Sequence, residues 1–349
     1  MEQPLVLLTG GAGFYGYHAA NYLAGKGYRV RVYDLVDPDH GEYPAGTEFR
    51  QNDVRDRESV RRALQDVSLV VHAAAALPLW SREDIMTTNV DGTRIILEES
   101  QKAKVDRAVY ISSTAIYGVP ERHPIYETDP MVGVGPYGES KILAEKACRE
   151  FREKGLCVPV LRPKTFIGTA RLGIFQVLYD WVESGKHIPV IGNGQNRYQL
   201  MEVEDLCFAT YLTLIGELSK VNDTFNVGAQ EFQTVNADLG ALCEYAKTCA
   251  RVMHTPAGLV KLALALFEKI HLSPLYKWIY GTADKDSFVS TEKIEKVLGW
   301  KAEYSNAAAL IRSYQWYLEH KNEIQGQVSG VTHRVAWKQG ILGLVKKFM

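Results

Sequence analysis

Short apolar runs alternate with helical patterns along the first half of the chain. The apolar runs lie at 5–8, 29–33, 69–72, 108–111 and 158–161, and each contains Val or Leu. Between them, helical patterns occupy 17–26, 58–64, 85–103 and 137–154. Strands that alternate with helices and carry apolar residues on both faces predict an α/β fold, in which helices cover both sides of a parallel sheet.

The pattern changes after about residue 162. Longer helical patterns at 174–183, 239–250 and 259–270 are separated by loops such as 191–194. We therefore expect a first α/β domain over 1–165, with later segments near 197–228 returning to it. A smaller, mostly helical second domain is expected over 166–320, followed by a tail at 321–349.

Composition and charge narrow the class of protein. The length of 349 residues favours two domains, and 40 Lys and Arg against 41 Asp and Glu argue against a general nucleic-acid binder. The five cysteines form no C-x-x-C pair and the nine histidines show no ligand spacing, so we expect neither disulfides nor a metal site. The first residues lack the features of a signal peptide, and the apolar run at 259–267 is too short to span a bilayer. These features favour a cytoplasmic protein.

A glycine-rich segment follows the first apolar run. Its glycines stand at Gly10, Gly13 and Gly16, with Phe14 and Tyr15 between the last two. Glycine lets the backbone turn sharply and approach a ligand closely, and the helix that follows offers free N–H groups to an anion. The segment is therefore a candidate site for the pyrophosphate of a dinucleotide.

Asp34 strengthens this interpretation, because it stands at the end of the second strand, 18 residues after Gly16. At that position a carboxylate can accept hydrogen bonds from the hydroxyls of an adenosine ribose. The same charge would repel a 2′-phosphate, which favours NAD over NADP as the cofactor. Arg29 and Arg31 precede Asp34 in the strand and weaken that preference only slightly.

Tyr137 and Lys141 form a candidate catalytic pair. Pro136 suits the start of a helix, and the two side chains, four residues apart, then share one helical face. A lysine ammonium beside a tyrosine stabilises the phenolate, so the tyrosine can accept a proton from a hydroxyl group at neutral pH. Next to a nicotinamide cofactor, this pair allows the alcohol carbon to release a hydride.

With these motifs the chain resembles the extended short-chain dehydrogenases/reductases, a family that includes nucleotide-sugar epimerases, dehydratases and hydroxysteroid dehydrogenases. The resemblance runs to about His320 and includes further segments at 52–54, 72–75, 89–93, 112–118 and 161–163. It implies a Rossmann-type doubly wound sheet with a smaller, mostly helical C-terminal substrate domain. It also implies a homodimer formed through the helices at 85–103 and 137–154.

The resemblance assigns roles to individual residues. It implies adenine contacts for Asp53 and Val54, and a second role for Lys141 in holding the nicotinamide ribose. The other implied cofactor contacts are Ala73, Ala74, Ala75, Asn89, Ser112 and Pro163. Ser113 matches the family's catalytic Ser/Thr, and Thr114 is its rival because the spacing of this motif varies between branches.

Residues around Ser113 narrow the reaction. Sugar dehydratases that resemble this family carry an Asp-Glu pair directly after the catalytic Ser/Thr, whereas Thr114 and Ala115 stand here, and the Glu of related decarboxylases is also missing from the segment. An epimerase or a simple alcohol oxidoreductase needs no such carboxylate. The intact Tyr137, Lys141 and Ser113 also argue against a non-enzymatic NAD-binding protein.

The residues expected near the substrate favour two different substrate classes. Arg197 matches the arginine that grips the substrate pyrophosphate in sugar-nucleotide enzymes, and Thr165, a second candidate substrate contact, replaces their Asn. A second phosphate-binding arginine motif is missing near 280–284, and the apolar helix at 259–270 is more typical of hydroxysteroid dehydrogenases and dihydroflavonol reductases. The first hypothesis is therefore an NAD-dependent nucleotide-sugar epimerase. The alternative is an NAD(P)-dependent dehydrogenase or reductase acting on a lipid-like or polycyclic hydroxyl.

The segment at 331–349 has a basic amphipathic pattern. Apolar residues recur at helical spacing with basic residues between them: Trp337, Ile341, Leu344 and Phe348, with Arg334, Lys338, Lys346 and Lys347. Such a segment can lie on an anionic membrane surface, or it can pack on its own domain or on a dimer partner. Peripheral membrane contact is therefore one expectation for this segment.

Overall fold

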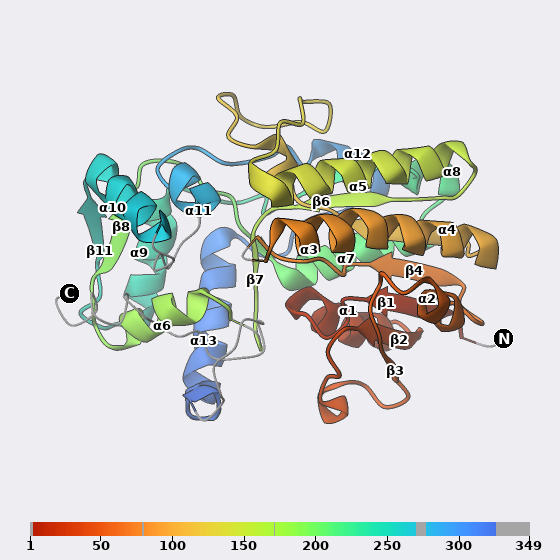
Figure 1. Cartoon of the computed structure of the whole chain (residues 1–349). Helices are drawn as coiled ribbons and strands as arrows, with labels where there is room; N and C mark the ends of the chain where they lie inside the picture. The colour runs from red at the N-terminus through yellow and green to blue at the C-terminus, as the bar shows by residue number, and fades with distance from the viewer. Residues whose placement is uncertain (1–2, 79, 171, 270–276, 326–349) are drawn as a thin grey trace.

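The computed structural model describes residues 3–78, 80–170, 172–269 and 277–325. Within these ranges, seven parallel strands form one sheet in the order β10-β6-β5-β4-β1-β2-β3 (Figure 1). The strands are β1 (Leu5–Thr9), β2 (Arg29–Asp34), β3 (Glu48–Gln51), β4 (Leu69–His72), β5 (Arg107–Ile111), β6 (Val160–Pro163) and β10 (Thr224–Val227). The Rossmann-type parallel sheet that the sequence predicts is confirmed.

Strand β1 shows why this sheet is buried on both faces. Its side chains alternate, so Val6 and Leu8 pack in one apolar cluster. Leu5 and Leu7 pack in a second cluster on the opposite face. A strand that is apolar at every position therefore needs a layer of helices on each side.

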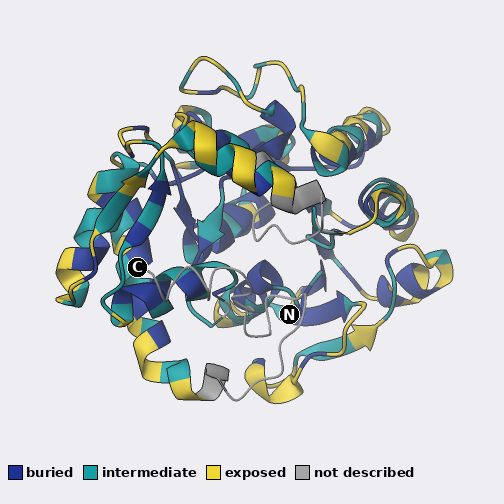
Figure 2. Ribbon diagram, turned by 60° about the vertical axis from the view of Figure 1, so that its left-hand side comes forward, coloured by how far each residue is buried: buried dark blue, intermediate teal, exposed yellow. Residues whose placement is uncertain are grey.

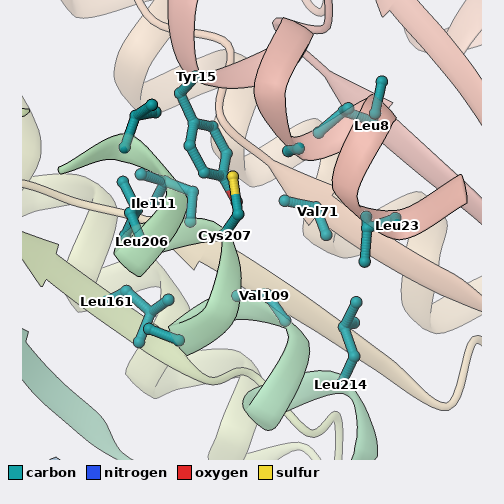
Figure 3. Close-up of a cluster of buried hydrophobic side chains, with 14 of the residues drawn as sticks. Leu8, Tyr15, Leu23, Val71, Val109, Ile111, Leu161, Leu206, Cys207 and Leu214 are labelled. Carbon is teal, nitrogen blue, oxygen red and sulfur yellow. The ribbon is translucent and has the colours of Figure 1, made fainter. Parts of the chain in front are cut away.

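Helices supply these two layers. α1 (Phe14–Gly25) and α7 (Val203–Ile215) bury apolar residues against the Leu8 face, where Figure 3 shows Tyr15 beside Cys207. The opposite face is covered by α2 (Arg57–Ala63), α4 (Thr93–Ala103) and α5 (Gly135–Glu153). With both faces covered, the loops after the carboxyl ends of the strands are the place where a ligand can bind.

The helix expected over 85–103 is interrupted. α3 (Arg82–Met86) begins three residues earlier, because the Ser81 hydroxyl accepts a hydrogen bond from the Asp84 N–H at 3.0 Å. One π-helical turn, η2 (Thr87–Gly92), then leads into α4. The first helix also begins earlier than its apolar spacing predicts, at Phe14 rather than at residue 17.

One edge of the sheet comes from a late segment of the chain. β10 pairs with β6, so that Phe225 lies opposite Leu161. In the same stretch of sequence, α7 packs against α1. The helices α8 (Leu218–Val221) and α12 (Glu292–Leu298) contact one another, and α12 also contacts β10. The sheet is therefore complete only with residues beyond 200.

The remaining elements form a smaller, mostly helical unit beside the sheet (Figure 1). Its helices are α6 (Phe175–Glu183), α9 (Val235–Ala246), α10 (Ala257–Lys269), α11 (Lys277–Thr282) and α13 (Asn306–Gln325). Two short parallel pairs join β7 (Phe166–Ile167) to β9 (Met201–Glu202) and β8 (Ile188–Ile191) to β11 (Val252–Thr255). Tyr179, Leu242 and Tyr314 belong to the core of this unit. Single 3-10 turns, η1 (His40–Glu42) and η3 (Thr114–Tyr117), lie in the loops after β2 and β5.

Exposure follows the layered architecture. Figure 2 shows buried central strands and helices that are exposed along their outer faces. On α10, the side chains of Leu259, Leu262 and Leu266 are 56–69% exposed. None of the helices in the described part of the chain is both long and apolar enough to cross a membrane. The basic segment at 331–349 lies outside the described residues.

Candidate active site

A cavity of about 280 Å³ lies where the central strands end. Most of the residues that the sequence singles out line it: Gly10, Gly13, Phe14, Tyr15, Gly16, Asp34, Asp53, Val54, Ala73, Ala74, Ala75, Ser112, Tyr137 and Lys141. These residues come from the loops after β1, β2, β3, β4 and β5 and from the first turns of α1 and α5. The structure thus brings the glycine-rich loop and the Tyr–Lys pair to one cavity.

The glycine-rich loop leaves no room for side chains at two positions. Gly10 has φ +70°, and a Cβ there would lie 2.7 Å from the Ala74 nitrogen. A Cβ on Gly16 would lie 2.2 Å from the Gly10 carbonyl oxygen. α1 begins directly after Gly13, and no side chain caps its first N–H groups. The loop therefore presents backbone N–H donors and a helix N-terminus, which together suit a pyrophosphate.

Asp34 lies against the glycine-rich loop. One of its carboxylate oxygens accepts a hydrogen bond from the Ala12 N–H at 2.9 Å, and the other accepts from the Val36 N–H at 3.0 Å. The arginines before it are engaged elsewhere, because Arg29 and Arg31 pair with Glu48 at 2.9 and 2.7 Å. With these arginines bound to Glu48, the preference for NAD over NADP gains support.

Sequence reasoning missed eleven of the residues that line the cavity, and eight of them are apolar. The missed lining residues are Ala12, Leu35, Val36, Asn52, Arg55, Ala76, Leu77, Trp80, Thr88, Ile111 and Phe166. Leu35, Val36 and Trp80 are 39–50% exposed, although each is large and apolar. Apolar residues directly after Asp34 were the available sequence signal, because a solvated loop rarely places two of them in a row.

The carboxylate of Asp53 is bound by the side chain of Arg55. The Arg55 guanidinium binds its carboxylate at 2.7 Å, and these hydrogen bonds lower the pKa of Asp53 below its usual value. The backbone carbonyl of Asp53 accepts a hydrogen bond from the Tyr33 hydroxyl at 2.8 Å. The Asp53–Val54 turn therefore keeps a fixed position at the cavity wall.

The first turns of α5 position Tyr137 and Lys141. Pro136 occupies the first turn, where its missing N–H does no harm, and the two side chains follow one turn apart. The Lys141 ammonium donates to the Ile111 carbonyl at 3.0 Å and lies 5.9 Å from the centre of the Tyr137 ring. Burial lowers the pKa of Lys141 to about 8, and the negative charge of Glu145 opposes this shift. The amine therefore remains largely protonated at neutral pH.

Glu145 belongs to a buried network that the sequence did not reveal. It lies one turn after Lys141 on α5, and its carboxylate accepts from the Ser112 hydroxyl at 2.5 Å. Arg162 pairs with the same carboxylate at 2.6 Å, and both side chains are under 5% exposed. Arg162 also donates to the Tyr117 hydroxyl at 2.7 Å. This network fixes the loop after β5 against α5.

Ser113 and Thr114 occupy different environments. The Ser113 oxygen accepts a hydrogen bond from the Ala115 N–H at 3.1 Å, and its residue is partly exposed. Thr114 is buried, and its hydroxyl donates to the carbonyl of Pro163 at 3.2 Å. None of Ser113, Thr114 and Pro163 lines the cavity itself.

Asn89 stands behind the cavity wall. Its side chain binds both backbone groups of Ala76, at 2.7 and 3.2 Å, and donates to the Ser140 hydroxyl at 3.0 Å. The Ser140 hydroxyl in turn donates to the Tyr137 carbonyl at 2.8 Å. Asn89 is 1% exposed and is not among the lining residues. It therefore joins the wall at Ala76 to the first turn of α5.

The two candidate substrate contacts, Thr165 and Arg197, lie outside the cavity lining. The Thr165 side chain is hydrogen-bonded to the hydroxyl of Tyr198. Arg197 is exposed, and its guanidinium packs against a contacting pair of aromatic rings, 4.6 Å from the centre of Phe232 and 4.7 Å from that of Phe288. In the described part of the chain, the guanidinium makes no salt bridge.

Known proteins resemble this chain in sequence and in fold. The model of the NAD dependent epimerase/dehydratase family matches residues 6–228. An uncharacterized protein of Sinorhizobium fredii, y4nG, is 35% identical over 97% of this chain and 85% of its own length. A UDP-glucose 4-epimerase of Rhizobium meliloti is 29% identical over 91% of this chain and 98% of its own length. The crystal structure of a Thermotoga maritima UDP-glucose 4-epimerase with UDP-glucose superposes with a TM-score of 0.76 at 24% identity, covering 91% and 99% of the two chains.

The cavity fits NAD, which is the cofactor of the matched family. Glycine is required at positions 10 and 16, where a Cβ would meet backbone atoms. Asp34 stands beside the loop as a ribose-binding carboxylate should. The family match covers well over half of the chain, and the geometry agrees with it. The chain therefore belongs to the NAD-dependent epimerase/dehydratase family and is an NAD-dependent enzyme.

Proposed function

We propose that this chain is a nucleotide-sugar epimerase that inverts one carbinol carbon of the sugar. The observation that carries the proposal is the placement of Tyr137 and Lys141 in one cavity with the glycine-rich loop. The relative from Rhizobium meliloti is a UDP-glucose 4-epimerase, and the match covers 98% of that protein and 91% of this chain. A UDP-hexose is therefore the first substrate to test.

Tyr137 is the proposed base. When bound, NAD supplies reversible hydride transfer at the sugar carbon. Tyr137 removes the proton from the hydroxyl on that carbon, and it returns the proton after the sugar has presented its other face. The Lys141 ammonium, one helical turn away, stabilises the phenolate that Tyr137 needs for this step. Its bond to the Ile111 carbonyl keeps it beside the tyrosine.

Ser113 is the proposed third catalytic residue. Its oxygen accepts from a backbone N–H, which leaves its own O–H to donate to the reacting oxygen. The Thr114 hydroxyl instead donates to a backbone carbonyl inside the protein. The chain also places Ala115 where a dehydratase would carry an acid. These contacts favour Ser113 over Thr114 and favour epimerisation over water loss.

The proposed cofactor contacts follow the walls of the cavity. The loop at Gly10, Gly13 and Gly16 holds the pyrophosphate, and Asp34 accepts from the adenosine ribose. Asp53 and Val54 border the adenine, and Lys141 holds the nicotinamide ribose. The remaining proposed contacts in the wall are Phe14, Tyr15, Ala73, Ala74, Ala75 and Ser112. Pro163, a further proposed contact, lies outside this lining, and Asn89 supports the wall from behind.

The alternative of a lipid-like substrate rests on the apolar helix at 259–270. In the structure this helix is α10, and Leu259, Leu262 and Leu266 on it are exposed. None of the three lines the cavity that holds Tyr137. The apolar residues of α10 therefore give no support for a binding pocket for a sterol-like molecule.

The test incubates the purified protein with UDP-glucose and catalytic NAD. We expect UDP-galactose to form without net NADH, because the hydride that leaves the sugar also returns to it. Absorbance at the NADH maximum and separation of the two sugars measure this directly. Net NADH from a sterol-like alcohol, without conversion of any nucleotide sugar, would contradict the proposal and support the oxidoreductase.

A further inference from the structure

Lys164 occupies a position where open α/β sheets bind ligands. It directly follows β6, and its backbone N–H donates to the Val227 carbonyl at 2.9 Å, which extends the pairing with β10. The carboxyl end of β6 lies beside that of β5, which leads to Ser112 in the cavity wall. Ligands of such sheets bind in the crevice outside these carboxyl ends.

The Lys164 side chain is buried among hydroxyl groups. The residue is 3% exposed, and its ammonium donates to the Ser287 hydroxyl oxygen at 2.7 Å. The ammonium also lies 5.1 Å from the centre of the Tyr198 ring. The Tyr198 hydroxyl is bound in turn by the side chains of Thr165 and Thr282. The cluster of Lys164, Thr165, Tyr198, Thr282 and Ser287 therefore contains one cation and four hydroxyl groups.

This cation has no carboxylate partner in the residues that the structure describes. Burial without such a partner lowers the pKa of Lys164 to about 7. Buried charges in proteins are normally paired, because an isolated ammonium loses its hydration without compensation. An anion from outside the chain would restore that pairing.

The backbone register places the side chains of Lys164 and Arg197 on opposite faces of the extended segments. Tyr198 pairs with Ser287 in a parallel bridge, so both side chains point to the face where Lys164 lies. Residues in extended segments alternate, and Arg197 and Phe288 accordingly pack together on the other face. The face with Lys164 also carries Thr165, which directly precedes the cavity-lining residue Phe166.

We propose that Lys164, rather than Arg197, is the cation that binds an oxyanion of the substrate. This inference rests on the proposed function, because it takes the ligand to be a nucleotide sugar. The oxyanion is a phosphate oxygen or a sugar carboxylate, and both present the same chemistry to an ammonium. Since the Ser287 oxygen accepts from Lys164, its own O–H is left to donate to that oxyanion.

The experiment compares Lys164→Met with Arg197→Met by calorimetric binding to the NAD-loaded enzyme. The ligands are uridine, UDP and UDP-glucuronate. Methionine keeps the apolar part of each side chain and removes its charged end. Lys293→Met is the matched control, because Lys293 lies outside the cluster and its ammonium pairs with the Asp223 carboxylate at 2.6 Å. Circular dichroism melting of each variant establishes that it is folded.

We expect Lys164→Met to weaken binding by about tenfold or more, and Arg197→Met to weaken it by less than about threefold. A loss for UDP but not for uridine identifies the phosphate as the bound group. A loss confined to UDP-glucuronate identifies the sugar carboxylate. In both cases Lys293→Met is expected to bind like the wild type.

Two outcomes overturn the inference, and they differ in what they say of the proposed function. If a folded Lys164→Met binds all three ligands like the wild type, Lys164 is not the binding cation and the proposed function stands. If the wild type binds neither UDP nor UDP-glucuronate, the proposed function fails together with the inference. A Lys164→Met chain that does not fold is replaced by Lys164→Gln, to which the same criteria apply.

Discussion

At the scale of single residues, Tyr137 and Lys141 lie one helical turn apart on α5, and the proposed mechanism requires a different protonation state of each. In the proposed mechanism, Tyr137 must lose its proton to act as a base, whereas Lys141 must keep its proton to stabilise the phenolate. Burial lowers the pKa of Lys141 to about 8, so the lysine loses its charge as the pH rises through that value. Activity that depends on the Lys141 ammonium is therefore expected to fall above about pH 8.

Tyr137→Phe tests the tyrosine alone. It removes one hydroxyl, and we expect turnover to fall by about 100-fold or more, as for the loss of a general base. NAD affinity should stay within about threefold of the wild type, since the glycine-rich loop and Asp34 are unchanged. Turnover of UDP-glucose and fluorescence titration with NAD measure the two effects. Activity within about threefold of the wild type would show that another group removes the proton.

The residues that line the cavity beside the glycine-rich loop can be predicted from the sequence more readily than the proposed substrate contacts. The glycine-rich loop, Asp34 and Tyr137 are recognisable because each proposed role depends on the spacing to residues close by in the sequence. Arg197 is harder to place, because its direction depends on which residue pairs with Ser287 far along the chain. Lys164 carries no spacing signal at all, since its environment forms only when β6 and the 283–288 segment come together.

At the scale of secondary-structure elements, the start of α1 is set by contacts between glycines. The Gly16 α-carbon lies so close to the Gly10 carbonyl that a Cβ would fall 2.2 Å from the oxygen. Both atoms belong to the backbone, so neither can move without displacing the loop. The close approach of α1 to the end of β1 therefore requires glycine at position 16.

Gly16→Ala and Gly25→Ala test this dependence within one helix. Gly16→Ala is expected to reduce stability by about 2 kcal/mol or more and to abolish measurable NAD binding. Gly25→Ala places its Cβ in open space at the end of α1 and is expected to raise stability by about 0.5–1 kcal/mol. Urea unfolding and NAD titration compare them. Equal effects of the two substitutions would contradict a role for close backbone packing.

The pattern of apolar residues predicts most elements of the sheet half but not all of their details. Strands such as β1 and β4 are apolar at nearly every position, so they are recognisable without any knowledge of their partners. β3 is half exposed at the sheet edge and has no such signal. The π turn η2 also cannot be predicted from apolar spacing, because the Asn89 side chain in it is held by contacts outside the helix, with Ala76 and with Ser140 of α5.

At the scale of the whole molecule, an ion pair joins α13 to the segment that leads into α7. Arg312 pairs with Glu202 at 2.6 Å and with Glu204 at 2.5 Å. The Glu202 side chain is fully buried. Burial raises the pKa of Glu202 from its usual 4.5 to about 8, although Arg312 opposes this shift. The folded state therefore holds a proton on Glu202 that the unfolded state releases above about pH 4.5.

Arg312→Met is expected to destabilise the protein in a pH-dependent way. A carboxyl group with a raised folded pKa loses stabilisation as the pH rises from about 4.5 to 8, and removal of Arg312 raises that pKa further. Because Glu202 keeps its proton in both folded proteins up to about pH 8, the extra loss appears only above that value: the deficit should be small at pH 7 and should reach on the order of 1 kcal/mol at pH 9. Melting curves at the two pH values measure it.

Lys296→Met is the matched control for this pair. Lys296 and Glu292 form an exposed i, i+4 ion pair with side chains more than 60% exposed. Its loss should change stability by less than about 0.5 kcal/mol at either pH. A deficit of Arg312→Met that stayed constant between pH 7 and pH 9 would speak against the role given to Glu202.

The pairing of β10 with β6 has a consequence for synthesis on the ribosome. The glycine-rich loop and the Tyr–Lys pair emerge early, but the strand that closes the β6 edge and the helix α7 that covers α1 emerge only after residue 200. Until then the nascent chain presents an open strand edge and an uncovered apolar helix, which are both prone to pair with other chains. The cofactor half is thus not a module that translation completes first, and a gene fragment cut at residue 165 would encode an unfinished sheet.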